Sequence, residues 1–280
     1  MKHRFSFTAP LCLFTASLSL CAIPSAFAQQ DAGQVHSPSK YLYLENIEIK
    51  PNQGNAFAKI QAEEVQAMRD AKAPGHFLSM WAITGPEHVI SMHGFDSFAD
   101  LQKDHEATMA MSKLADTMKA DDAEQAATIA NAHGSIYRWD KDLSLGAPID
   151  LSKMRFMRIL LFQVRSGHDD DFNHLVKLFA KAYEAIPEAR WAVFEKTYGV
   201  GSGNTYILVT PMESLSTVDM MIGSNKKFTD AVGEDQLAML RKGLDADVES
   251  LEADLFAFDP SISYVPDSWI TSSPDFWGKK

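Results

Sequence analysis

Five side chains of this sequence are of types that could bind and transform a small molecule. His93 is the candidate general base, because histidine titrates near neutral pH. The candidate ligand-binding residues are Tyr43, Glu45, Trp81 and Arg158, a few polar groups among apolar ones, which is the usual composition of a ligand site. The alternatives are structural: a histidine satisfied in the core, and a salt bridge between Glu45 and Arg158, since buried charges need partners.

The sequence contains little that supports metal chemistry. His168 and His174 stand on either side of a helix start, without a metal-binding spacing such as HExxH. The acidic run 169–171 between them is explained by the favourable interaction of negative charge with the first turn of a helix. We predict no metal site, and the sequence leaves any cofactor unknown.

These residues lie on elements that occur twice in the chain. The first copy opens with a β-rich segment at 41–49 and a helical one at about 55–72, and the second with 156–164 and about 170–185. An offset of 115 residues aligns the two openings. In the second helix the apolar residues recur at the spacing of a helix packed by one face. Self-similarity of this kind indicates a duplicated structural unit.

Each opening is followed by the same further elements. In the first copy we expect paired strands at 77–83 and 88–95, helix to about 132 and a strand at 136–140; in the second, paired strands at 191–197 and 205–210, helix to about 252 and a strand at 255–259. Each copy therefore has the order β-α-β-β-α-β, which is that of a ferredoxin-like unit. We predict an α+β protein made of two tandem ferredoxin-like units.

Two such units in tandem resemble the dimeric α/β-barrel superfamily over about residues 40–260, through element order and spacing. The resemblance implies that the two sheets pack into one barrel, as a pseudo-dimer within one chain. That superfamily includes small monooxygenases, haem-degrading and haem-binding enzymes, dehydratases, stress-responsive proteins and members without known activity. The Asn, Trp and His set of the haem-degrading branch is not found in this sequence, so that activity is not implied. Fold alone does not fix function.

Strand phase predicts which side chains line the barrel, because side chains alternate between the two faces of a strand. The face with Leu42, Leu44, Met157 and Ile159 is apolar in both copies and suits helix packing. The opposite face carries Tyr43, Glu45 and Ile47 in the first copy and Arg158, Leu160 and Phe162 in the second. We expect this second face to look into the barrel, so that Tyr43 and Arg158 meet in one interior that His93 also faces.

The ends of the chain differ from its body. Residues 1–28 have a basic start, an apolar middle and small residues before Gln29, the pattern of a secretory signal peptide. Lipid attachment at Cys21 is the alternative, which Leu20 disfavours because it is not small. We predict a signal peptide at 1–28, a flexible leader at 29–39, a first unit at 40–140, a linker at 141–154, a second unit at 155–260 and an aromatic C-terminal tail at 261–280.

Composition narrows the functional classes. Both cysteines, Cys12 and Cys21, fall in the predicted signal peptide, so the exported chain is expected to contain no thiol and no disulfide. Cleavage removes Lys2 and Arg4 but no acid, which changes the formal charge from −11 to −13 and makes nucleic acid a poor partner. No downstream segment predicts a membrane span.

Two functions remain open at this point. The first is an exported protein, periplasmic or secreted, that binds a small and partly apolar ligand, in the form of a cofactor-independent monooxygenase-like enzyme. The alternative is a non-catalytic binding or structural module that acts through its surface or its aromatic tail. In that case the sheets or the tail mediate association with another protein or with itself. For either function we expect the tail to lie on the body as an extended arm, because four exposed large aromatic side chains on a free tail would be unusual.

Overall fold

The computed structural model describes residues 37–184, 186, 188–201 and 204–279. All described residues belong to one compact unit within Asp31–Lys280. The predicted signal peptide and most of the predicted leader lie outside the described residues. Within the described part of the chain, no helix combines the length and the apolar character needed to cross a membrane.

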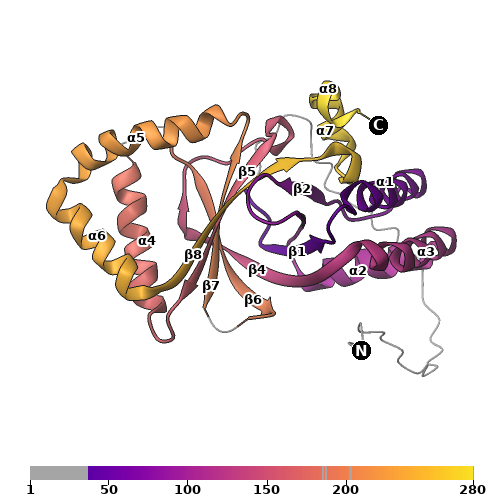
Figure 1. Ribbon diagram of the computed structural model, residues 1–280, viewed down its shortest axis with the longest axis horizontal. Coiled ribbons are helices and arrows are strands. Elements are labelled where there is room, and N and C mark those ends of the chain that lie inside the picture. The colour runs from indigo at the N-terminus through magenta and orange to yellow at the C-terminus, as the bar shows by residue number, and fades with distance from the viewer. Residues whose placement is uncertain (1–36, 185, 187, 202–203, 280) are drawn as a thin grey trace, which may run out of the picture. The chain divides into compact units, whose positions relative to one another are not determined.

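The described residues form two successive sets of strands and helices, followed by a tail (Figure 1). The first set is β1 (Tyr41–Ile49), α1 (Gly54–Ala71), β2 (Leu78–Ala82), β3 (His88–Phe95), α2 (Phe98–Ala110), α3 (Ser112–Thr128) and β4 (Ile129–Leu145). The second set is β5 (Phe156–Val164), α4 (Asp169–Tyr183), β6 (Trp191–Gly199), β7 (Thr205–Met212), α5 (Ser216–Val232), α6 (Glu234–Asp247) and β8 (Val248–Phe258). Short turns of helix complete the chain at η1 (Leu151–Lys153), η2 (Pro260–Ile262), α7 (Asp267–Ser272) and α8 (Pro274–Trp277).

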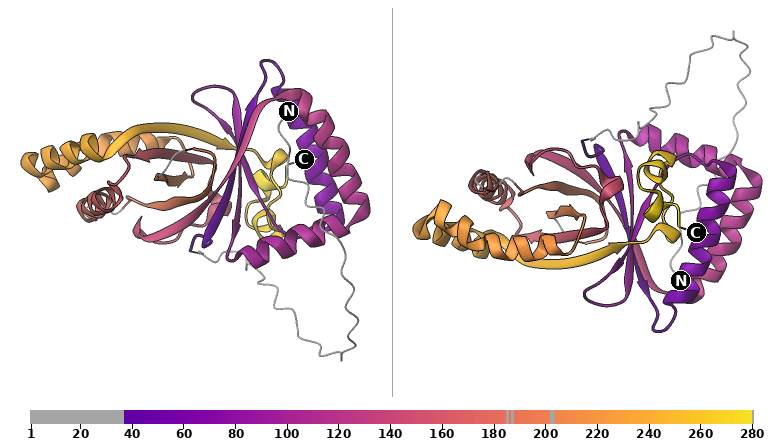
Figure 2. Two further views of the ribbon diagram at one scale, coloured as in Figure 1. Left: turned by 90° about the horizontal axis from the view of Figure 1, so that it is seen from below. Right: turned by 90° about the horizontal axis from the view of Figure 1, so that it is seen from above.

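The eight strands form one closed antiparallel barrel, in the order β1-β3-β2-β8-β5-β7-β6-β4. The strands β4, β1, β3 and β2 are neighbours in the first half, and β8, β5, β7 and β6 repeat that order in the second. The pairs β2–β8 and β4–β6 join the halves. The helices α1–α3 lie outside one side of the barrel and α4–α6 outside the other (Figures 1 and 2). The predicted α+β class and the barrel are therefore confirmed.

The predicted hairpins are present, but the long helical regions end sooner than predicted. β2 pairs with β3, and β6 with β7. The first helical region is broken at Met111 and the second at Gly233, whose φ of 82° favours glycine. The strands β4 and β8 begin ahead of their predicted starts because they pair with β1 and β5, and sheet pairing overrides a local preference for helix.

The interior of the barrel is filled with apolar side chains. One cluster of buried residues draws on all eight strands and, among the described residues, on none of the helices α1–α6. Its strand members are Leu44, Leu78, Met80, Ile90, Met92, Tyr137, Met157, Ile159, Phe194, Ile207, Val209, Phe256 and Phe258. A cluster that every strand shares lies inside the ring, so the barrel holds a solid core.

The two faces of each opening strand are therefore reversed relative to the prediction. Leu44 and Ile159, expected against the helices, belong to the barrel core. Phe162, expected inside the barrel, packs instead with Phe172 of α4, and Ile47 packs with Phe57 of α1. Both faces of these strands are covered, so the alternation identifies the residues that share a face but not the layer that each face meets.

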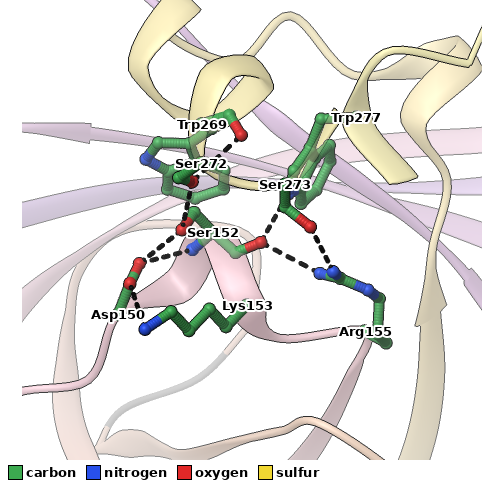
Figure 3. A network of polar contacts seen from close by, with 8 residues as sticks. All are labelled: Asp150, Ser152, Lys153, Arg155, Trp269, Ser272, Ser273 and Trp277. Carbon is green, nitrogen blue, oxygen red and sulfur yellow. Dashed lines mark hydrogen bonds and ion pairs between the residues drawn. The ribbon is translucent and has the colours of Figure 1, made fainter. Parts of the chain in front are cut away.

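The tail lies on the body, as predicted, but as short helical turns rather than as an extended arm. Trp277 is only 1% exposed, packs on Phe258 at the end of β8, and donates a hydrogen bond from Nε1 to the backbone oxygen of Ser152 at 2.7 Å. Arg155 donates to the same oxygen at 2.9 Å and to the Ser273 hydroxyl at 2.5 Å (Figure 3). These contacts fasten the tail to the segment that joins β4 to β5.

Candidate functional site

A cavity of about 1060 Å³ lies outside the barrel core, between the second half of the sheet and its helices. Its floor is formed by the helix-facing side chains of β5, β6 and β7, and its walls by α4 and the first half of α5. None of residues 216–224, which form that half of α5, is buried. Phe228 further along α5 is buried and stacks on Tyr183 with ring centroids 4.3 Å apart. The helix is thus anchored at one end and leaves space beneath the other.

The walls of the cavity are mainly apolar. Leu160 and Phe162 project from β5, and Val176 and Phe179 project from α4 toward them. Side chains alternate between the two faces of β5, so the side chains between those that line the cavity point into the barrel core. The strand therefore separates the filled barrel interior from the cavity. A space of this size and lining suits an apolar small molecule.

Arg158 is the charged group of the cavity floor. It lies on β5 directly opposite Thr210 of β7, and both residues line the cavity. The guanidinium Nη1 lies 3.9 Å from the thioether sulfur of Met221 on α5, which is a weak acceptor. Burial lowers the pKa of Arg158, because the charged form loses hydration, while Tyr183 acts in the opposite direction.

Tyr183 places a hydroxyl group near this arginine. Its ring makes an edge contact with Trp191, with centroids 5.4 Å apart, besides the stacking on Phe228. Burial raises the pKa of Tyr183, and the positive charge of Arg158 partly offsets that effect. Two aromatic neighbours therefore hold a neutral phenol in the cavity wall.

The other predicted site residues lie in the first half of the protein and do not line this cavity. Tyr43 and His93 form a register pair between β1 and β3. The Tyr43 side chain covers Gly134 of β4, where an added Cβ would lie 2.4 Å from the phenol oxygen. His93 lies against Gly75, and burial lowers its pKa, with Asp104 acting in the opposite direction. The structure thus brings Tyr43 and His93 together but separates them from Arg158.

The predicted pairing of Glu45 with Arg158 is wrong. Burial raises the pKa of Glu64 on α1 to about 7, and neighbouring carboxylates add to this effect, Asp121 first and Glu45 last. Glu45 therefore interacts with Glu64. Trp81 donates a hydrogen bond from Nε1 to Asp259 at 3.0 Å and makes an edge contact with an aromatic ring of α1. These residues share the helix side of the first half, because their face of the sheet meets α1 and α3 rather than the barrel core.

Sequence reasoning missed two parts of the candidate site and one cluster of side chains with metal-ligand atom types. Thr210 carries no pattern that marks it, and Tyr183 continues the apolar stripe of α4 and so was assigned to the core. His168, Asp171 and Asp247 offer ligand atoms within 4.8 Å of one another, although no metal site was predicted. The imidazole lies 3.0 Å from Asp247, a residue from the distant end of α6 that spacing along the chain cannot associate with His168.

Comparison with known proteins supports the fold alone. No protein-family model matches the chain, and no curated protein matches it. A proposed monooxygenase from Fusobacterium nucleatum has a similar structure, with a TM-score of 0.51 and 11% identity over 78% of this chain and 91% of that one. An anthrone oxidase-like protein matches with a TM-score of 0.51 and 12% identity over 81% of this chain and 93% of that one. The chain therefore shares its overall fold with these two proteins.

Proposed function

We propose that the protein binds a small apolar molecule in the cavity of its second half. The observation that carries this proposal is a space of about 1060 Å³ with mainly apolar walls, beside a barrel whose own interior is filled. The repeated strand order supports the finer proposal that the chain is a tandem of two ferredoxin-like units. Because the barrel closes within one chain, self-association would use other surfaces; it stays a prediction.

The enzymatic form of this proposal is a cofactor-independent monooxygenase-like reaction. Two proteins with similar folds are described as a proposed monooxygenase and as anthrone oxidase-like. In a reaction of that class a methylene group and O₂ give a carbonyl group and water, which balances without a further reductant. The mainly apolar walls suit an apolar substrate for such a reaction. His93 does not line the cavity, so it is not the base for a ligand bound there.

The second candidate function is a non-catalytic module. The filled barrel interior favours it, because apolar side chains of the described strands occupy the space in which a shared site was expected. The tail is not free for partners along its whole length, since Trp277 is buried. A binding experiment that reads occupancy of the cavity separates this function from the first.

Export is part of the proposal and rests on residues 1–28 of the sequence. We expect N-terminal sequencing of the protein isolated from its host to begin at Gln29, in the periplasmic or the secreted fraction. A cytoplasmic protein that keeps Met1 would contradict export while leaving the cavity proposal intact.

Occupancy of the cavity can be tested with the neutral fluorophore N-phenyl-1-naphthylamine, which brightens in apolar surroundings. We expect saturable binding to the wild-type chain and its loss in Leu160→Trp and in Leu208→Trp, which fill the cavity from two strands. Ile83→Trp, at a side chain 46% exposed and outside the cavity, is the matched control. Undiminished binding in both filled variants, with their thermal unfolding unchanged, would refute the proposed site.

A further inference from the structure

We infer that the ligand of this cavity carries an acidic oxygen group, a carboxylate or a phenolate, which Arg158 binds. The inference rests on the proposed function of the cavity and adds the chemical class of its ligand. It starts from a cation in the floor of an apolar space, opposite Thr210 and close to Tyr183.

Arg158 has no carboxylate partner among the residues that the structure describes. Its hydrogen bond is to the Met221 sulfur, and a thioether satisfies a guanidinium poorly. A partly buried cation is normally paired, because removing it from water is unfavourable. The pKa of Arg158 is lowered by burial, and Tyr183 rather than a carboxylate opposes that effect. We therefore expect a ligand to supply the negative charge that pairs with the Arg158 guanidinium.

The two acidic residues that line the cavity do not supply this partner. Glu188 and Glu213 are both exposed. Glu213 acts on Arg155, outside the cavity, and neither glutamate affects the pKa of Arg158. Both carboxylates are thus exposed to water, where they compete little for the partly buried guanidinium.

The other polar groups close to Arg158 are hydroxyls that can donate. Thr210 is 7% exposed, and its hydroxyl makes no hydrogen bond with any described residue. The Tyr183 hydroxyl likewise has no hydrogen-bond partner among the described residues, although its ring is fixed by Trp191 and Phe228. A guanidinium and two hydroxyls directed at one apolar space match a ligand oxygen that carries negative charge.

The first half of the protein provides an internal comparison. Register places Tyr43 opposite His93 there, where the second half has Arg158 opposite Thr210. The equivalent position in the first half therefore has a phenol in place of the guanidinium. The repeated fold does not require an arginine at this position. This difference supports a role of Arg158 that is specific to the cavity of the second half.

The test uses two probes that differ by one anionic group. 8-Anilino-1-naphthalenesulfonate is the sulfonate of N-phenyl-1-naphthylamine, so the pair isolates the contribution of the charge. We expect Arg158→Met to weaken sulfonate binding roughly ten- to a hundredfold, as for the loss of a charge-assisted hydrogen bond. Binding of the neutral probe should change less than about twofold, because methionine preserves most of the apolar stem.

Arg190→Met is the matched control, since Arg190 lines the cavity but is exposed. Equal weakening of sulfonate binding in both variants would show that the loss of affinity comes from the overall positive charge rather than from Arg158, and would overturn the inference. Equal weakening of both probes in Arg158→Met would also overturn it, because that pattern indicates lost packing. If the wild-type chain binds neither probe, the proposed function fails; if it binds the neutral probe without a preference for the sulfonate, only this inference fails.

Displacement of the bound sulfonate distinguishes the two acidic classes. Displacement by 1-naphthoate at neutral pH supports a carboxylate ligand. Displacement by 1-naphthol that strengthens as the pH passes through the naphthol pKa supports a phenolate ligand. If neutral 1-naphthalenemethanol displaces as well as either, the acidic oxygen is not recognised and the inference is refuted.

Discussion

Arg158 on β5 lies directly opposite Thr210 on β7, and both side chains line the cavity between this half of the sheet and its helices. A cation and a hydroxyl in register across two neighbouring strands can contact the same ligand atom, because opposite residues on one face lie about 5 Å apart. The site is therefore built on sheet elements, whose geometry is fixed by the barrel core on their other face.

We predict that Thr210→Val selectively weakens the binding of anionic ligands. Valine preserves the shape of threonine and removes the hydroxyl, so the affinity for 8-anilino-1-naphthalenesulfonate should fall by about two- to tenfold, as for a neutral hydrogen bond. Fluorescence titration measures the change, with the neutral N-phenyl-1-naphthylamine as the control. Unaltered sulfonate affinity would show that Thr210 does not contact the ligand.

We predict that adjacent residues of β5 respond differently to truncation. Ile159 is 6% exposed in the barrel core, so Ile159→Ala should lower the free energy of unfolding by about 2–5 kcal/mol through lost packing. Leu160 borders the existing cavity, so Leu160→Ala should cost clearly less and enlarge the ligand site. Urea denaturation measures both. A larger cost for Leu160 than for Ile159 would contradict the assignment of the two faces.

We predict that Glu64 makes stability depend on pH. Burial, followed by nearby carboxylates, raises its pKa from 4.5 to about 7 in the folded protein. Between these values the unfolded chain releases the proton while the folded chain keeps it, so the folded state is destabilised as the pH rises, and fully so above pH 7. Glu64→Gln, which stays neutral, should raise the free energy of unfolding at pH 8 by about 2–3 kcal/mol.

At pH 4 both states hold the Glu64 proton, so the same variant should then have nearly the stability of the wild type. Glu63→Gln is the matched control, because that side chain is 58% exposed on the same helix. Chemical denaturation at pH 4, 6 and 8 supplies the comparison. A stabilisation of Glu64→Gln that is equal at all three values would rule out the raised pKa as its cause.

We predict that the tail stabilises the body through Trp277. Trp277→Ala should lower the free energy of unfolding by about 3–5 kcal/mol, as for other buried aromatic truncations. Trp277→Phe keeps most of the packing on Phe258 and loses the hydrogen bond to Ser152, so it should cost about 1–2 kcal/mol. Thermal or chemical unfolding distinguishes the two variants. Wild-type stability in both would mean that the tail is not part of the folded body.

The repeated pattern of apolar residues predicted the order of strands and helices, because periodicity along the chain is a local property. The offset of 115 residues between the two openings relates Phe57 of α1 to Phe172 of α4, and both side chains are buried. The layer that each strand face meets could not be predicted, since the helix layer and the barrel core are both apolar. Leu44 and Ile47 both became buried, one on each face.

The site was predictable only in part for a related reason. Arg158 was identified because a charge on an apolar strand is exceptional, and it does line a cavity. Its neighbours Tyr183 and Met221 come from α4 and α5. No local sequence pattern specifies how these helices pack on the sheet. The cavity itself arises where the first half of α5 is not buried against the sheet, a consequence of how Phe228 anchors the helix near its other end.

We propose that the cavity of the second half holds a small, mainly apolar molecule with an acidic group. Native mass spectrometry of the protein purified from its own host is the direct test of this proposal. We expect a mass excess on the wild-type chain that denaturation releases as one compound, detectable as a negative ion. The excess should be absent from Leu160→Trp and reduced in Arg158→Met. A bare wild-type chain, or an equal load on wild type and Leu160→Trp, would contradict the claim.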